Sequence, residues 1–223
     1  MSYINNLIVS FVQLLPKSVV RIFSSKYIAG DTLQDAVNLT QSLNKKGIYS
    51  TIDVLGESIT SRDEAIYAKN ECLKVLDAIK KYDLKANLSI KPTQMGLTLD
   101  SELCYQQVSE LIEKAKSIDN FVRIDMEDSS TTDLTINLYK RLRENYDNVG
   151  IVMQSYMRRT ISDVKNLLTY KTNYRLCKGI YVEPETVAFK GKDEVRKNYL
   201  DALRVMFEND LYVGIATHDE YLI

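Results

Sequence analysis

The chain has 223 residues, which is enough for one domain of ordinary size or for a short α/β barrel. Apolar residues make up 45% of it and charged residues 26%, as in globular proteins, and its formal net charge of −1 gives no electrostatic argument for a nucleic-acid partner. The three prolines and eight glycines signal no disordered tract, and three cysteines without a Cys-x-x-Cys pair indicate free thiols in a reducing compartment.

An apolar stretch at residues 4–15 opens the chain and is interrupted by asparagine and glutamine. It is shorter than the roughly 20 residues that span a bilayer, and it lacks the basic start of a signal peptide. We interpret it as an amphipathic helix, with a contact to a membrane surface as the alternative. We therefore expect helices over residues 1–46, packed on a second part formed by residues 47–223.

Six short apolar runs follow along the chain, and each ends in a polar or ionisable residue. They cover residues 48–53, 86–91, 121–125, 149–154, 174–178 and 213–218, and they end in Asp53, Lys91, Asp125, Gln154, Lys178 and His218. Chemistry at the carboxyl ends of parallel strands is typical of the (β/α)8 barrel, whose sites gather at that face.

Helical patterns fill the gaps between these runs. Capping signals predict helix starts near Asp31, Ser61, Asp100, Ser130 and Thr160, and a further helix is expected over residues 192–209. Alternating strands and helices predict a parallel sheet in the α/β class.

The competing architecture is an open doubly wound sheet, which usually carries a Gly-rich nucleotide turn after its first strand. Here the turn at residues 54–57 holds one glycine, and the sequence contains neither G-x-G-x-x-G nor a P-loop. Since six units are visible and a closed barrel has eight, the chain is either a fragment or not a complete barrel.

Three carboxylates, Asp125, Glu127 and Asp128, follow the third run. Asp125 could lie in a pocket, while Glu127 and Asp128 could instead cap the next helix. A divalent-metal site is a third interpretation, because Mg²⁺ prefers carboxylate oxygens.

Basic residues mark three other strand ends. Arg175 and Lys178 lie three residues apart in an apolar run, where unpaired charge is costly, although a surface ion pair would explain them too. Lys91 could bind a carboxylate or phosphate, form a Schiff base, or be a solvated strand-end lysine. His218 lies between Thr217 and Asp219, which favours a functional over a structural histidine.

These motifs, in one collinear order, resemble the proline dehydrogenase family. The matching segments are residues 53–57 (Asp-Val-Leu-Gly-Glu), 89–91 (Ser-Ile-Lys), 123–127 (Arg-Ile-Asp-Met-Glu), 154–156 (Gln-Ser-Tyr), 175–181 (Arg-Leu-Cys-Lys-Gly-Ile-Tyr) and 216–219 (Ala-Thr-His-Asp). The chain is similar to the bacterial monofunctional form, which is related to the dehydrogenase domain of proline utilization A.

The resemblance implies a (β/α)8 barrel of the TIM type, of which about six βα units are present, truncated after the sixth strand. It also implies oxidation of L-proline to Δ1-pyrroline-5-carboxylate with reduction of FAD. Electrons would pass to a membrane quinone. The protein would be cytoplasmic, with peripheral association at the inner face of the membrane as a second expectation.

The resemblance also implies roles for named residues. Lys91 and Tyr181 would bind the substrate, Asp125 would order the basic groups, and Arg175 would lie near flavin N5 as the second catalytic residue. No metal ligand is implied. The remaining expected cofactor contacts are Met126 through its backbone, Gln154 at the isoalloxazine edge, Lys178, Gly179, Ile180, Thr217 and His218.

The chain departs from the family pattern at its C-terminus, where a last helix with an Arg pair for the proline carboxylate is expected and absent. Cys177 and Ile180 also stand where related sequences often have valine and alanine. We therefore expect the chain alone to bind proline poorly or not at all. Two alternatives are a non-catalytic flavin-binding or regulatory fragment and a divalent-metal barrel enzyme.

Overall fold

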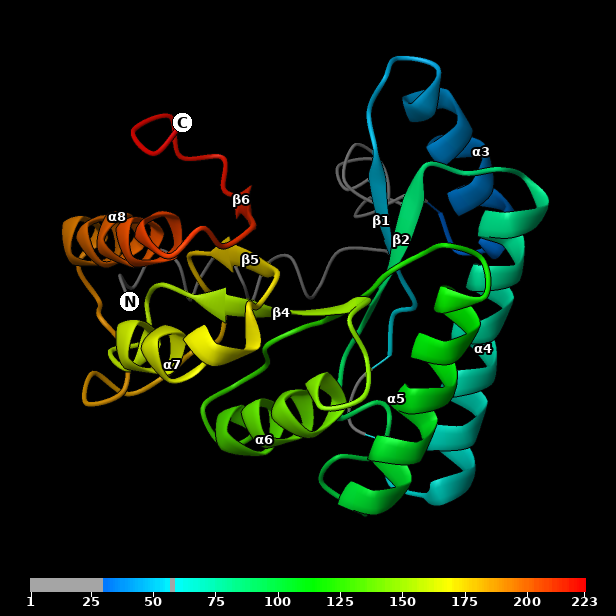
Figure 1. Ribbon diagram of the computed structural model, residues 1–223, viewed down its shortest axis with the longest axis horizontal. Coiled ribbons are helices and arrows are strands. Elements are labelled where there is room, and N and C mark those ends of the chain that lie inside the picture. The colour runs from blue at the N-terminus through cyan, green and yellow to red at the C-terminus, as the bar shows by residue number, and fades with distance from the viewer. Residues whose placement is uncertain (1–29, 57–58) are drawn as a thin grey trace, which may run out of the picture. The chain divides into compact units, whose positions relative to one another are not determined.

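The computed structural model describes residues 30–56 and 59–223 (Figure 1). The chain divides into two compact units at Ser50 and Thr51. The expected division into helices over residues 1–46 and a second part over residues 47–223 stays a prediction. The apolar stretch at residues 4–15, and with it most of the predicted N-terminal helices, lies outside the described residues.

In the first unit, α3 (Leu33–Asn44) begins one residue later than the signal at Asp31 suggested. Its N-cap is Thr32, whose hydroxyl accepts the N–H of Asp35 at 3.2 Å. The Asp35 carboxylate in turn accepts the N–H of Thr32 at 3.1 Å. This reciprocal capping box satisfies two backbone donors at the helix start.

Six strands form one sheet in which the spatial order follows the chain order. They are β1 (Ser50–Asp53), β2 (Ala86–Ile90), β3 (Val122–Ile124), β4 (Val149–Gln154), β5 (Tyr174–Cys177) and β6 (Val213–Ala216). Strands β2 to β6 pair in parallel, with Ser89 beside Arg123 and Val152 beside Arg175. The six predicted strands are confirmed, each within a few residues of its expected bounds.

A helical segment separates each strand from the next, from β1 to β6 (Figure 1). The helices between β3 and β4 and between β4 and β5 are shorter than the others. The helices of the second unit are α4 (Arg62–Lys81), α5 (Ser101–Lys116), α6 (Thr132–Arg143), α7 (Thr160–Asn166), the 3-10 turn η1 (Leu168–Tyr170) and α8 (Lys192–Glu208). Helix α4 packs against α5 and β2, and α7 packs against α8. The predicted βα alternation is confirmed. Among the described helices, none combines the length and the apolar character needed to cross a bilayer.

Two of the predicted helix starts are correct in their capping chemistry and two are not. Ser61 and Asp100 accept backbone N–H groups at the starts of α4 and α5. Helix α6 begins at Thr132, close to the predicted start at Ser130, but its N-cap is Thr131, which makes no side-chain hydrogen bond. Helix α7 begins at Thr160, as predicted, but its N-cap is Arg159, and the Thr160 hydroxyl donates to the carbonyl of Gln154 (2.6 Å).

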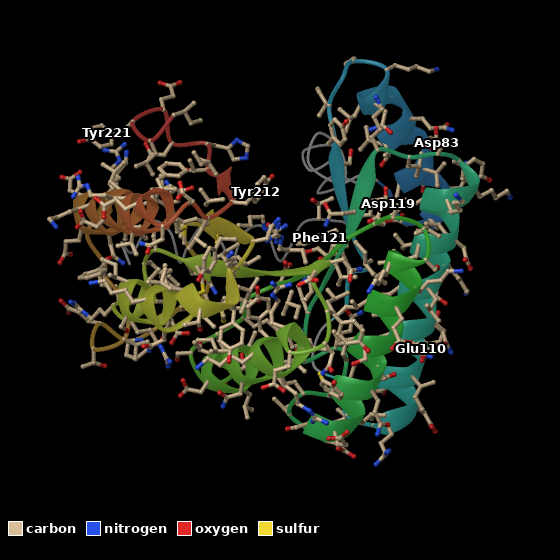
Figure 2. The ribbon with its side chains drawn as sticks, viewed as in Figure 1. Asp83, Glu110, Asp119, Phe121, Tyr212 and Tyr221 are labelled. Atoms are coloured by element: carbon tan, nitrogen blue, oxygen red, sulfur yellow. The ribbon has the colours of Figure 1, made fainter. Side chains whose placement is uncertain are left out.

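Aspartates in the left-handed conformation make three of the turns that lead from a helix into the next strand. The φ angles of Asp83, Asp119 and Asp210 are 49°, 54° and 54° (Asp83 and Asp119 are labelled in Figure 2). Aspartate tolerates this region better than most residues with a Cβ atom, so these turns form without glycine.

Apolar and polar side chains alternate along the strands, so that the apolar core lies on one face of the sheet and the polar residues of the site lie on the other. Residues on the helix-covered face are fully buried, among them Leu88, Ile90, Ile124, Ile151 and Leu176. The Tyr199 hydroxyl of α8 donates to the carbonyl of Leu176 at 2.7 Å, which fixes α8 on β5. Successive side chains of a strand point to opposite faces, so the polar residues between these apolar ones project to the other side.

Candidate functional site at the carboxyl ends of the strands

A pocket of about 560 Å³ lies at the carboxyl ends of β2 to β6. All eleven site residues expected from the sequence line it: Lys91, Asp125, Met126, Gln154, Arg175, Lys178, Gly179, Ile180, Tyr181, Thr217 and His218. Val152, Cys177 and Ala216 complete the lining with small or apolar groups. The structure thus brings together residues that are up to 127 positions apart in the chain, from Lys91 to His218.

Arg175 is fixed inside the pocket by a carboxylate from another strand. Its Nη2 donates to Asp125 Oδ1, an oxygen that also accepts the Ser89 hydroxyl at 2.6 Å. Arg175 Nη2 lies 3.5 Å from the Ser89 oxygen as well. The guanidinium is therefore held by groups from β2 and the end of β3, and it is not a surface ion pair.

Lys91 forms an ion pair with Asp53 at the ends of the two neighbouring strands. The Lys91 side chain is only 13% exposed, so it is not a solvated strand-end lysine. Burial acts to lower the pKa of Lys91, but the hydrogen bond and charge of Asp53 raise that pKa overall. Burial raises the pKa of Asp53, and the Lys91 ammonium opposes this effect. The pair therefore keeps a cation at the pocket wall.

Gln154, at the end of β4, has one satisfied and one unsatisfied end. Its Nε2 donates to the carbonyls of Met126 (2.9 Å) and Glu127 (2.7 Å), which fixes the amide orientation. Its Oε1 is buried and has no hydrogen-bond partner among the described residues. A buried acceptor without a donor is costly, so this atom marks a place where a ligand N–H or O–H would be stabilised. The backbone of Met126 is an expected cofactor contact, and its carbonyl accepts one of these two bonds.

Lys178 is linked to the sixth strand through Asp219. Its Nζ donates to Asp219 Oδ2 at 3.1 Å, and Arg196 of α8 donates to both oxygens of the same carboxylate, at 2.9 and 2.5 Å. The Asp219 N–H donates to the Thr217 hydroxyl at 3.1 Å. Hydrogen bonds from Arg196 hold the pKa of Asp219 well below its usual range.

Gly179 is required by a neighbouring ring. Its φ is +109°, and a Cβ atom there would lie 2.1 Å from the Tyr156 ring. The absence of a side chain at Gly179 therefore makes room for Tyr156, and the expected contact of Gly179 with a cofactor stays a prediction. The Tyr156 hydroxyl is buried without a partner in the described part of the chain, and burial raises its pKa.

The three carboxylates after β3 go to three different places. Asp125 pairs with Arg175, Glu127 accepts the N–H and hydroxyl of Thr93 (2.9 and 2.5 Å), and Asp128 accepts the N–H of Ser130 (2.9 Å). The interpretation of Glu127 as a cap of α6 is therefore wrong, while Asp128 does stabilise the turn before α6. Within residues 30–56 and 59–223, no three Asp, Glu, His or Cys side chains are arranged to share a metal ion.

The remaining predicted residues lie at the rim of the pocket. Ile180 is 87% exposed and His218 is exposed as well, whereas Tyr181 and Thr217 are half-buried. The three cysteines are free, as expected, and burial raises the pKa of Cys177 to about 11, so its thiol stays protonated at neutral pH.

Sequence reasoning did not assign roles to three residues that organise the site. Asp53 and Ser89 were visible only as parts of strand-end motifs, and Arg196 was one of many charged residues on a helix. Strand-end position is a signal that could have found the first two. Nothing local marks Arg196, because its partner lies 23 residues further along the chain.

Three comparisons with known proteins agree with one another. A family profile described as proline dehydrogenase matches residues 36–222. Proline dehydrogenase 1 of Bacillus subtilis subsp. natto is 35% identical over 203 residues, which cover 91% of this chain and 67% of that protein. The proline dehydrogenase of Deinococcus radiodurans is 30% identical over 217 residues, covering 95% of this chain and 70% of that protein.

Solved structures show the same fold. The crystal structure of proline utilization A from Bdellovibrio bacteriovorus matches with a TM-score of 0.78 and 23% identity, over 88% of this chain and 25% of that one. Proline utilization A from Corynebacterium freiburgense matches with a TM-score of 0.70 and 22% identity. The chain thus spans about two thirds of the Bacillus relative and a quarter of the larger Bdellovibrio protein.

Proposed function

Since the chain belongs to the proline dehydrogenase family, we propose that it serves the FAD-dependent oxidation of L-proline to Δ1-pyrroline-5-carboxylate, with a quinone as electron acceptor. The observation that carries the proposal is the single pocket lined by all eleven residues that the family resemblance implied. Proline catabolism is the setting in which this reaction belongs.

The pocket residues fit a flavin. The buried Gln154 Oε1 is an acceptor without a donor, and a flavin ring carries one N–H group that such an acceptor can bind. Val152, Cys177 and Ala216 offer small or apolar surface beside it, as a flat ring system requires. Lys178 adds positive charge for the anionic part of a dinucleotide.

Bound FAD supplies a hydride acceptor, and the protein supplies position and charge around it. Arg175, held by Asp125 and Ser89, keeps a fixed cation in the pocket. A cation fixed in advance stabilises negative charge that develops during the reaction, since no reorganisation is needed at that moment.

Lys91 is the proposed anchor of the substrate carboxylate. Its ammonium has three N–H donors and uses one of them on Asp53. The raised pKa of Lys91 keeps it charged over the physiological range, so it can attract a carboxylate without losing its own partner. Holding the substrate in one orientation is the main contribution that a hydride transfer needs from side chains.

The visible spectrum of the purified chain tests the proposal. We expect a bound-flavin spectrum that a high concentration of anaerobic L-proline bleaches and a soluble quinone analogue restores, with the weak proline affinity expected from the sequence. The Arg175→Gln variant should lower the bleaching rate by about tenfold or more, as expected for loss of a fixed charge at the reacting centre. The matched control is Arg141→Gln, which removes an exposed guanidinium paired with Glu102 on the surface.

Other outcomes would contradict this proposal. Flavin that stays oxidised in the presence of proline would indicate a non-catalytic flavin-binding protein. A colourless protein whose activity is lost to a chelator would indicate a metal enzyme.

Co-sedimentation with lipid vesicles, with and without quinone, tests the expected peripheral membrane association.

A further inference from the structure

One buried carboxylate ties together three separate parts of the chain beside the pocket. We name Asp219, Arg196 and Lys178 the Asp219 cluster. Asp219 accepts two hydrogen bonds from Arg196 of α8 and one from Lys178 after β5. It also accepts the N–H of Tyr221 at 3.3 Å, which closes the turn after β6.

Burial, ring stacking and a two-pronged ion pair hold the Asp219 cluster in one arrangement. The Asp219 side chain is 5% exposed, and Arg196 stacks over the ring of Tyr221 with its guanidinium carbon 4.6 Å from the ring centre (Tyr221 is labelled in Figure 2). The two Arg196–Asp219 bonds are the fork-like pairing that fixes a carboxylate in one orientation. Because Arg196 holds Asp219, the carboxylate cannot swing toward the solvent.

Arg196 and Lys178 share Asp219 unequally. The Arg196 bonds measure 2.9 and 2.5 Å, whereas the Lys178 bond measures 3.1 Å. The Lys178 side chain is 38% exposed and lines the pocket. Asp193 lies 3.6 Å from Arg196 and balances one of the two cations that share Asp219. The more exposed and more loosely held of these two cations is Lys178.

Arg196 itself is not part of the pocket lining. Its connection to the pocket runs through Asp219 to Lys178, and through the same carboxylate to the segment that carries Thr217 and His218. Any effect of Arg196 on a ligand in the pocket is therefore expected to pass through Asp219.

We propose that Asp219, held by Arg196, is a positioning residue that keeps the Lys178 ammonium directed into the pocket and available to an anionic part of the flavin. This inference rests on the proposed flavin-binding function. It assigns to Asp219 and Arg196 an effect on cofactor affinity that neither exerts by direct contact.

A double-mutant cycle on flavin affinity tests the proposal. We expect Lys178→Ala and Asp219→Ala each to raise the dissociation constant for FAD by about tenfold, and the double variant to raise it by about tenfold too. Effects that multiply to about a hundredfold would show that Asp219 does not act through Lys178. The matched control is Asp201→Ala on α8, the helix that carries Arg196; it removes ion pairs with Lys197 and Arg204 that do not reach the pocket.

A second cycle covers the case in which Asp219→Ala does not fold. Arg196→Gln leaves Asp219 in place and removes its two-pronged partner, so its effect on FAD affinity should again be non-additive with that of Lys178→Ala. An effect of Arg196→Gln that is unchanged in the Lys178→Ala background would overturn the proposal.

Hydrogen exchange separates this inference from the proposed function. If the wild-type chain binds no FAD, the proposed function fails on that titration alone. The cluster is then tested by amide exchange in residues 217–223, which we expect to be about tenfold faster in Arg196→Gln than in Asp201→Ala. Equal exchange in the two variants would overturn the inference.

Discussion

Gln154 shows how the surrounding backbone fixes one side chain before any ligand is involved. Two carbonyls from the turn after β3 accept its amide N–H groups, so the oxygen has one direction left to face. The polar atom that the fold leaves unsatisfied is thus the one directed away from those carbonyls. Buried groups of this kind reduce stability by themselves, which makes them informative about function.

The Gln154→Leu variant tests the role of Gln154 in the stability of the fold and in flavin binding. We expect it to lower the free energy of unfolding by about 1–3 kcal/mol, because two buried carbonyls lose their donor, and to weaken flavin binding. Urea denaturation followed by circular dichroism measures the first effect. The exposed Gln106→Leu substitution on α5 is the control and should stay within about 0.5 kcal/mol of the wild type. Unchanged stability of Gln154→Leu would show that losing the two hydrogen bonds does not outweigh removing the unsatisfied Oε1.

Gly179 carries a conformational requirement that can be tested against another glycine of the same region. Gly179→Ala combines a left-handed backbone with a clash against the Tyr156 ring, and should cost more than about 1 kcal/mol. Gly214→Ala in β6 meets its nearest atom at 3.7 Å, which is ordinary contact, and should cost less. Thermal unfolding of the two variants provides the comparison, and equal losses would contradict the role of the ring.

At the level of elements, β5 contributes more to the pocket than any one neighbour, since Arg175 and Cys177 project from the strand and residues 178–181 follow it. Helix α8 holds this strand from the other face through the hydroxyl of Tyr199. The position of the site therefore depends on a contact on the side of the sheet away from the pocket.

The Tyr199→Phe variant tests that dependence. We expect a loss of about 1 kcal/mol, because the buried carbonyl of Leu176 loses the tyrosine hydroxyl while the ring still fills its space. Tyr67→Phe, at an exposed position of α4, is the matched control. A stability equal to that of the wild type would show that α8 is held by apolar packing alone.

The strands and their polar ends could be predicted from local patterns, whereas residues such as Met126, Ile180 and Tyr181 were expected in the site only because of the family resemblance. Apolar runs that end in polar residues mark strand ends, and the parallel topology brings those ends to one edge. The N-caps of α6 and α7 could not be predicted, because neither Thr131 nor Arg159 makes a side-chain cap hydrogen bond and the Thr160 hydroxyl donates to the carbonyl of Gln154. The ion pairs Arg175–Asp125 and Arg196–Asp219 could not be predicted either, because no sequence periodicity relates the two residues of each pair.

For the whole molecule, the Asp219 cluster makes stability depend on pH in acid. The folded-state pKa of Asp219 is lowered by the Arg196 hydrogen bonds, so its contribution is present above the unfolded value of about 3.9 and is lost as the pH falls through the folded-state value. The stability difference between the wild type and Asp219→Asn should therefore be largest above about pH 5 and shrink below about pH 4. Denaturation midpoints measured between about pH 3 and about pH 7 check this, and a constant difference would exclude the linkage.

The three pocket cations are each paired with a carboxylate from another strand: Lys91 with Asp53, Arg175 with Asp125 and Lys178 with Asp219. The electric fields of such paired charges largely cancel at a distance. The pocket cations can therefore bind an anionic group at short range but do little to steer a distant ligand toward the pocket. We expect the association rate constant for FAD, measured by stopped-flow fluorescence, to change less than about threefold between about 20 and about 300 mM salt. A fall of about tenfold would reveal electrostatic steering. Without steering, the selectivity of this pocket lies in how slowly the right ligand leaves.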